Sequence, residues 1–204
     1  MINLDPSLEL IGFLCRHGEL TNQHVWDGWG NLDLSEEGRQ QAEAAARWLS
    51  FERIGRVVSS DLPRAIHTAE YIMDSGAVQC PFLGTDPNLR PRMTGKFTGQ
   101  EKTPERLAEF QKYLDDPDLI VPEGESETQL KLRIQVVYQY LAAPYKCLPT
   151  VLVMHNSVIK AILDVPNLKE AVSNGGIIAV LMNPKGEFSF QVVLGHVNEA
   201  KGVS

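Results

Sequence analysis

The hydrophobic positions of the chain fall into short apolar runs that alternate with longer amphipathic segments. There are five short runs, 10–15, 56–60, 150–154, 176–181 and 188–194, and the middle three are rich in β-branched residues and lead into polar residues. Runs of this kind are typical of strands buried in a sheet. The turn sequence Asn-Pro-Lys-Gly-Glu at 183–187 separates the last two runs, so they are predicted to form a hairpin.

The segments between the runs carry apolar residues at helical spacing. The spacing predicts helices over 35–49, 61–73, 103–114, 126–141 and 157–163. Ser35 and Asp61 are placed to cap the first two, and Ser126 with Gln129 fits a capping box for the fourth. Asn156 and Ser157 could cap the fifth or donate hydrogen bonds to a phosphate, and capping is the favoured interpretation.

This order of elements predicts an α/β fold with a mostly parallel sheet. We expect one domain over residues 1–204, with an insertion at about 79–125 that is rich in Pro and Gly and covers one end of the sheet. Ligands of such sheets bind outside the carboxyl ends of the strands, so the insertion is predicted to lie over the ligand.

The composition of the chain argues against several classes of partner. The formal net charge is −7, and no Lys or Arg stripe is present, which argues against nucleic acid or an anionic membrane as partner. The first residues have no leader pattern, no segment has the length of a membrane span, and three scattered cysteines suggest neither zinc nor a disulfide framework. We therefore expect a cytoplasmic protein that acts on a small ligand.

Three strand ends deliver the polar residues that could carry chemistry. The first run ends at Arg16 and His17, the second leads to Arg64, and the third ends at His155. A neutral imidazole can accept a phosphoryl group, and arginines match its oxygens. Gly18 is expected to let the backbone approach this ligand closely. No metal or other cofactor is required, although each residue alone could be structural, and a metal site at the two histidines is a further alternative.

Several motifs, in the same order along the chain, resemble those of the histidine phosphatase superfamily, the phosphoglycerate mutase-like proteins. They are LCRHGE, LDLSEEGRQQAEAAARWL, VVSSDLPRAIHTAEYI, PEGES and VLVMHNSVIKAIL. The resemblance covers nearly the whole chain. It implies a three-layer α/β/α sandwich whose insertion acts as a cap over a small phosphorylated substrate.

The resemblance also implies roles for individual residues. His17 would accept the phosphoryl group, Arg16 and Arg64 would hold its oxygens, and His155 would hydrogen-bond to it. Gln23 occupies the position of a family asparagine and could donate to a phosphate oxygen. The family position of the general acid falls on Pro91, which cannot donate a proton.

Other carboxyl groups could replace that acid, and Glu101, Asp86 and Glu125 are candidates. The first hypothesis is a metal-independent phosphomonoester phosphatase that forms a phosphohistidine on His17. Two alternatives are a catalytically weak member of the fold that binds phosphorylated ligands or a protein, and a mutase-type phosphotransferase. The sequence leaves the substrate and the oligomeric state open.

Overall fold

A six-stranded sheet forms the centre of the protein, seen in a computed structural model that describes residues 5, 7–80, 83–164 and 172–195. The strands, in chain order, are β1 (Glu9–Arg16), β2 (Arg56–Ser59), β3 (Gly84–Thr85), β4 (Thr150–Met154), β5 (Ile177–Met182) and β6 (Phe188–Leu194). Their order across the sheet is β3-β2-β4-β1-β5-β6. The first four in this order are parallel, whereas β5 and β6 form an antiparallel hairpin at one edge. The predicted mostly parallel sheet and its terminal hairpin are confirmed.

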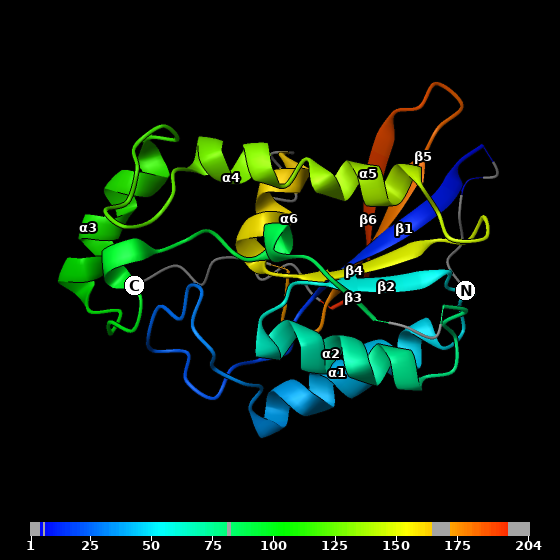
Figure 1. The fold of residues 1–204 in the computed structure, drawn as a ribbon, viewed down its shortest axis with the longest axis horizontal. Coiled ribbons are helices and arrows are strands. Elements are labelled where there is room, and N and C mark those ends of the chain that lie inside the picture. The colour runs from blue at the N-terminus through cyan, green and yellow to red at the C-terminus, as the bar shows by residue number, and fades with distance from the viewer. Residues whose placement is uncertain (1–4, 6, 81–82, 165–171, 196–204) are drawn as a thin grey trace.

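Helices cover both faces of this sheet (Figure 1). They are α1 (Glu36–Leu49), α2 (Pro63–Asp74), α3 (Pro104–Asp115), α4 (Glu127–Arg133), α5 (Val136–Ala142) and α6 (Asn156–Leu163), with short 3-10 turns η1 (Pro87–Leu89) and η2 (Gly95–Phe97). One core packs α1 and α2 against Phe13 and Val153, and the other packs α4, α5 and α6 against Leu14 and Leu152. Neighbouring strand residues point to opposite faces, so the apolar runs supply both cores. The expected three-layer α/β/α arrangement is confirmed.

The helix predicted over 126–141 is two shorter helices, α4 and α5, that end and begin around Ile134. The predicted capping box at Ser126 and Gln129 is present. The apolar stripe continues through the break, since Leu130, Ile134, Val137 and Leu141 are all buried. Burial of one face therefore holds the two helices in line although the helical hydrogen bonding is interrupted.

Asp61 does not cap α2, contrary to the prediction. The residue at the cap position is Leu62, which makes no side-chain cap hydrogen bond. The Asp61 carboxylate instead accepts hydrogen bonds from Nε and Nη2 of Arg90, at 2.7 and 2.6 Å. A bidentate arginine is a stronger partner than a helix amide, and it ties the start of α2 to the segment after η1.

The range 79–125 contributes first to the sheet edge, through β3, and then to a separate lobe containing α3 (Figure 1). This lobe has a small aromatic core of its own, in which Trp26, Phe97 and Val121 are buried and Phe110 and Tyr113 pack against them. Trp26 belongs to the loop that follows β1, so the lobe is closed by a residue from outside it. In the part of the chain described, no helix is long and apolar enough to cross a bilayer.

Candidate active site

The pairing register of the sheet places His17 beside His155. Strands β1 and β4 are parallel, and Arg16 pairs with Met154, so the next residue of each strand is a histidine at the same sheet edge. The backbone N–H of His17 donates to the Met154 carbonyl at 3.0 Å. The two imidazole rings lie with their centroids 4.9 Å apart. The structure thus brings together two histidines that are 138 positions apart in the sequence.

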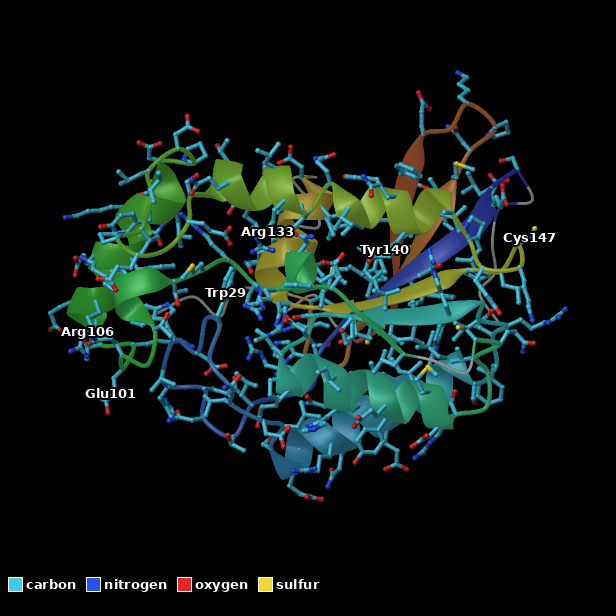
Figure 2. All side chains as sticks on the ribbon, viewed as in Figure 1. Trp29, Glu101, Arg106, Arg133, Tyr140 and Cys147 are labelled. Carbon is cyan, nitrogen blue, oxygen red and sulfur yellow. The ribbon has the colours of Figure 1, made fainter. Side chains whose placement is uncertain are left out.

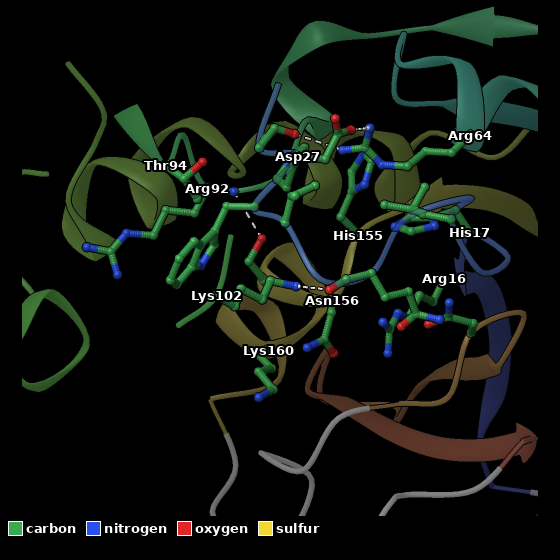
Figure 3. A pocket seen from close by; sticks show the side chains of 18 of the residues that line it. Arg16, His17, Asp27, Arg64, Arg92, Thr94, Lys102, His155, Asn156 and Lys160 are labelled. Carbon is green, nitrogen blue, oxygen red and sulfur yellow. Dashed lines mark hydrogen bonds and ion pairs between the residues drawn. The ribbon is translucent and has the colours of Figure 1, made fainter. Parts of the chain in front are cut away.

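Two arginines predicted at the site lie at the same end of a pocket as these histidines (Figure 3). Nη1 of Arg16 donates to the Val172 carbonyl at 2.5 Å. Both guanidinium groups of Arg64 and Arg16 are removed from water, and this burial lowers the pKa of each to about 10. Both stay charged at neutral pH. Their Nε atoms are buried and have no hydrogen-bond partner among the described residues, so each has a donor left for an anion.

The ring of His17 is held in one tautomer. Its Nδ1 lies 2.6 Å from the Gly18 carbonyl oxygen, which can only accept, so Nδ1 carries the hydrogen. Burial, together with the charges of Arg64 and Arg16, lowers the pKa of His17 to about 3. The ring is therefore neutral at pH 7, and its Nε2 carries a free lone pair.

His155 is buried, and within the described part of the chain neither of its ring nitrogens has a hydrogen-bond partner. Burial, then the neighbouring His17 and Arg64, lower its pKa well below the usual histidine value. His155 itself is the cap residue of α6, which makes the predicted capping by Asn156 or Ser157 wrong. The Ser157 hydroxyl instead accepts from the backbone N–H of Arg92 at 2.9 Å, and Asn156 faces the pocket with a buried, unpartnered Oδ1.

The pocket has a volume of about 390 Å³ and also includes Gln23 and Pro91 in its wall. Among the described residues that line it are five cationic and two anionic side chains: Arg16, Arg64, Arg92, Lys102, Lys160, Asp27 and Glu127. A protein with net charge −7 thus concentrates positive charge in one cavity. Converging cations of this kind attract an anionic ligand against the mean field of the molecule.

Asp27 is one of the pocket residues that the sequence analysis did not predict. Its Oδ2 lies 2.6 Å from Nη1 of Arg64, and the side chains are 10% and 3% exposed. The carbonyls of Gly28 and Gly30 accept from the same guanidinium at 2.8 and 3.1 Å. An acidic residue between two tryptophans was the only sequence signal, and it does not indicate which cation the carboxylate would meet.

None of the three candidate acids lines the pocket. Glu101 lies at the outer edge of the lobe and is exposed (Figure 2). Asp86 is buried, where its carboxylate accepts from the Tyr140 hydroxyl at 2.9 Å and from the backbone N–H of Asn88 at 2.8 Å. Glu125 forms an ion pair with Arg133 at 2.5 Å and accepts from the backbone N–H of Met93.

Pro91, at the family acid position, is fixed by hydrogen bonds to its carbonyl. Nε1 of Trp29 donates to this oxygen at 2.8 Å, and Nη2 of Arg133 donates at 2.9 Å. The guanidinium of Arg133 lies 5.8 Å from the Trp29 ring centroid, and Figure 2 shows the two side chains between the lobe and the sheet. The position is therefore a rigid part of the pocket wall, not a gap that a distant carboxylate fills.

Packing within the protein requires a glycine at position 18, and the predicted approach of its backbone to a ligand stays a prediction. A Cβ atom at Gly18 would lie 2.1 Å from the carbonyl oxygen of Gly38 in α1. A Cβ atom at Gly38 would in turn lie 2.1 Å from the carbonyl oxygen of Glu19. The start of α1 thus packs directly on the backbone that follows His17.

Residues 13–167 match the sequence pattern of the histidine phosphatase superfamily, branch 1. The chain belongs to this superfamily. It is 36% identical over 160 residues to phosphoglycerate mutase-like protein 4 of Arabidopsis thaliana, which covers 73% of this chain and 67% of that protein. It is 33% identical to the fructose-2,6-bisphosphatase TIGAR of Xenopus laevis over 63% of this chain, and it spans only about half (48%) of that relative.

Among solved structures, a mycobacterial glucosyl-3-phosphoglycerate phosphatase in complex with VO3 superimposes with a TM-score of 0.74. The sequence identity is 25%, and the match covers 91% of this chain and 98% of that one. Relatives of this superfamily member therefore include both phosphatases and mutase-like proteins. The motif resemblance and the fold implied by it are confirmed.

Proposed function

We propose that the protein is a metal-independent phosphomonoester phosphatase that works through a phosphohistidine at His17. The observation that carries the proposal is the state of the His17 ring. Its Nδ1–H is bound to the Gly18 carbonyl, and its low pKa keeps it neutral, so Nε2 is a nucleophile at physiological pH. His17 lines the pocket, so this lone pair is presented to a ligand there.

The surrounding cations would hold the phosphoryl group. The unpartnered Nε atoms of Arg16 and Arg64 would donate to its oxygens, and both guanidinium groups would stabilise the charge of the transition state. Since these groups supply the positive charge, the mechanism uses no metal ion. Gln23, on the pocket wall, would be a further donor.

His155 would act as a hydrogen-bond donor to the phosphoryl group. Both of its nitrogens are free of protein partners, so its N–H has no competing acceptor. The first turn of α6 follows directly and would add the positive end of the helix dipole. A bound dianion would offset the desolvation that keeps this ring neutral.

Hydrolysis is favoured over mutase activity by the named phosphatases among the relatives, TIGAR and the mycobacterial enzyme. Pro91 favours a second candidate, a phosphate-binding protein with little catalysis, because proline cannot protonate a leaving group. Loss of a general acid costs about 10²–10⁴-fold for substrates that need one. The two candidates differ in whether any phosphoryl group reaches His17.

The test is p-nitrophenyl phosphate hydrolysis in excess EDTA by the wild type, His17→Ala and His67→Ala. His67 lies on α2, outside the pocket wall, bound to Asp33, so it is the matched histidine control. We expect turnover in the wild type and in His67→Ala and none in His17→Ala, with an acid-labile, base-stable phosphoryl label on the wild-type protein after rapid quenching. Full activity of His17→Ala would refute the proposal, and phosphate binding without turnover or label would favour the binding protein. Loss of all activity in EDTA would refute the metal-independent mechanism.

A further inference from the structure

Two arginines and two histidines gather at one end of the pocket: Arg16, Arg64, His17 and His155, while Arg92 and Lys102 lie toward the other end (Figure 3). Among the described residues, six apolar side chains also line the wall: Leu20, Val25, Trp26, Pro91, Phe110 and Leu114. A phosphoryl group held by the two arginines fills only their end, so the remaining volume faces the organic part of a substrate.

Aromatic packing holds this wall rigidly. The ring of Trp26 lies 5.4 Å from that of Phe110, and Phe97 lies 5.3 and 5.1 Å from these two rings. Trp26 is 8% exposed and Phe97 is 3% exposed, so the cluster is buried on the side away from the pocket. Preorganised aromatic walls of this type favour flat apolar ligands.

Helix α3 leaves apolar surface uncovered at the mouth of the pocket. It has no buried residue, although Phe110 and Leu114 lie four positions apart and therefore on one side of it. Leu114 is 51% exposed and belongs to the pocket wall, whereas Leu107, on the same helix and 47% exposed, does not. A substrate with an apolar group would cover Leu114 but not Leu107.

Few carboxylates of the pocket could protonate a leaving group. Among the described residues of the wall, only Asp27 and Glu127 carry one: Asp27 is hydrogen-bonded to Arg64 at 2.6 Å, and Glu127 lies 3.9 Å from Arg92, an ion pair without a hydrogen bond. An alcohol that leaves as an alkoxide, with a pKa near that of water at about 15.7, needs such a proton. A phenol leaves as a phenolate, since its pKa is about 10, as for the tyrosine side chain.

We propose that the substrate is an aryl phosphate, in which an aromatic ring directly carries the ester oxygen. This inference rests on the proposed function. The ring would pack against Trp26, Phe110 and Leu114 while the phosphoryl group sits at the end of the two arginines. Nε2 of His17 bonds to phosphorus as the bond between phosphorus and the aryl oxygen breaks, and the electron pair leaves on the phenolate. Water then attacks phosphorus, and the P–N bond breaks with its electron pair returning to Nε2, which leaves His17 neutral. One hydrogen of that water stays on the inorganic phosphate, and the other passes to solvent, from which the phenolate takes a proton to become the phenol.

Three substrates separate the contribution of the ring from that of the leaving group. Phenyl phosphate has a ring and a phenolate leaving group, benzyl phosphate has a ring and an alkoxide leaving group, and glycerol phosphate has an alkoxide and no ring. We expect KM to be similar for the first two and at least about tenfold higher for the third, as for loss of a well-packed apolar group. We expect kcat to be about 10²–10⁴-fold higher for phenyl than for benzyl phosphate, the usual contribution of an acid.

The matched variants are Leu114→Ala and Leu107→Ala, which remove the same group from equally exposed positions of one helix. Leu114→Ala should raise KM for phenyl phosphate several-fold and leave KM for glycerol phosphate unchanged, while Leu107→Ala should change neither. Pro91→Glu, which places a carboxyl group on the wall, should narrow the kcat gap between phenyl and benzyl phosphate.

Two failures are distinguishable. Equal or better turnover of glycerol phosphate, or identical effects of the two leucine variants, would overturn the aryl phosphate inference and leave the phosphohistidine mechanism standing. No turnover and no phosphohistidine with any of the three substrates would overturn the proposed function, and this inference with it.

Discussion

The Oδ2 atom of Asp27 lies 2.6 Å from Nη1 of Arg64, and the two side chains are buried together in the wall of the pocket. Asp27 therefore fixes the arginine that we propose to hold the phosphoryl group, yet it brings a negative charge to the same place. The ion pair stabilises the empty site and competes with the ligand. A phosphate dianion that binds to Arg64 would lie beside the Asp27 carboxylate, which is already paired with Nη1 of this arginine.

Replacing Asp27 by asparagine separates these two effects. The amide keeps an acceptor for Nη1 but removes the charge, so the Asp27→Asn variant should lose about 1–3 kcal/mol of unfolding free energy, as when a buried hydrogen bond loses its charged partner. The same variant should bind inorganic phosphate several-fold more tightly, because the repulsion is gone. Urea denaturation and calorimetric titration measure the two quantities. Weaker phosphate binding would contradict the competition.

The contact between Gly18 and Gly38 should tolerate no side chain. Gly18→Ala and Gly38→Ala each place a Cβ atom 2.1 Å from a carbonyl oxygen. Each should lower the unfolding free energy by about 1–3 kcal/mol or more, the usual cost of overpacking. Gly84→Ala is the control, since its Cβ would meet atoms no closer than 3.6 Å. Equal stability of Gly18→Ala and Gly84→Ala in a denaturant titration would show that the helix can shift without cost.

The buried histidines should make stability depend on pH. The pKa of His17 is lowered in the folded protein to about 3 because the ring is buried beside arginines, whereas an unfolded histidine titrates near its ordinary value of 6.5. Between these values the unfolded chain binds more protons, so the unfolding free energy contributed by the neutral ring is complete above pH 6.5 and declines as the pH falls toward 3.

The His17→Gln variant isolates this contribution. Between about pH 6 and pH 5 the wild type should lose up to about 1.4 kcal/mol more unfolding free energy than His17→Gln, because one group then binds close to one extra proton in the unfolded state. Carboxylates titrate equally in both proteins and cancel in the difference. His24→Gln, which changes an exposed histidine, should behave as the wild type does. If the unfolding free energies of the wild type and His17→Gln changed equally with pH, the His17 ring would bind its proton in the folded protein at the same pH as in the unfolded chain.

Arg133 should be the main support of the wall around Pro91. Its guanidinium donates to the carbonyls of Asn88, Arg90 and Pro91 and to the Glu125 carboxylate, with both ionic side chains mostly buried. Arg133→Met should cost about 3–5 kcal/mol of unfolding free energy, because it leaves a buried carboxylate unpaired.

Lys131→Met is the control for this change. Lys131 lies in the same helix, and its ion pair with Asp164 is exposed, so its loss should cost no more than about 1 kcal/mol. Thermal unfolding of the two variants compares them directly. A similar small loss in both would mean that the 88–93 segment is held by other contacts.

The end of the site that holds two histidines and two arginines could be predicted from the sequence, because these residues follow buried strands. Apolar runs end where the sheet ends, so Arg16, His17 and His155 were predicted to lie at one edge, and the register between β1 and β4 places the histidines side by side. Arg64 follows from the same reasoning, one helical turn beyond a strand. Hydrophobic periodicity depends only on residues near one another in the sequence, and the ends of these strands can be located from that periodicity alone.

The rest of the site depends on contacts between loops, which periodicity does not describe. Asp27 contacts Arg64 only because the loop after β1 folds back over α2. Asp61 was predicted to cap a helix because the sequence does not show that Arg90 approaches it. Pro91 marked the missing acid in the sequence, but only the structure shows that Glu101, Asp86 and Glu125 all lie away from the pocket. The break between α4 and α5 could not be predicted either, because the helical spacing of apolar residues continues unchanged across it.

The loop after β1 joins the lobe as closely as it joins the sheet. The Trp26 backbone exchanges hydrogen bonds with Gln100 and Gly99, and the Lys102 N–H donates to the His24 carbonyl. Asp27 is the next residue after Trp26, so one short piece of chain contacts both the lobe and Arg64. A displacement of the lobe relative to the sheet would therefore pull on the ion pair between Asp27 and Arg64.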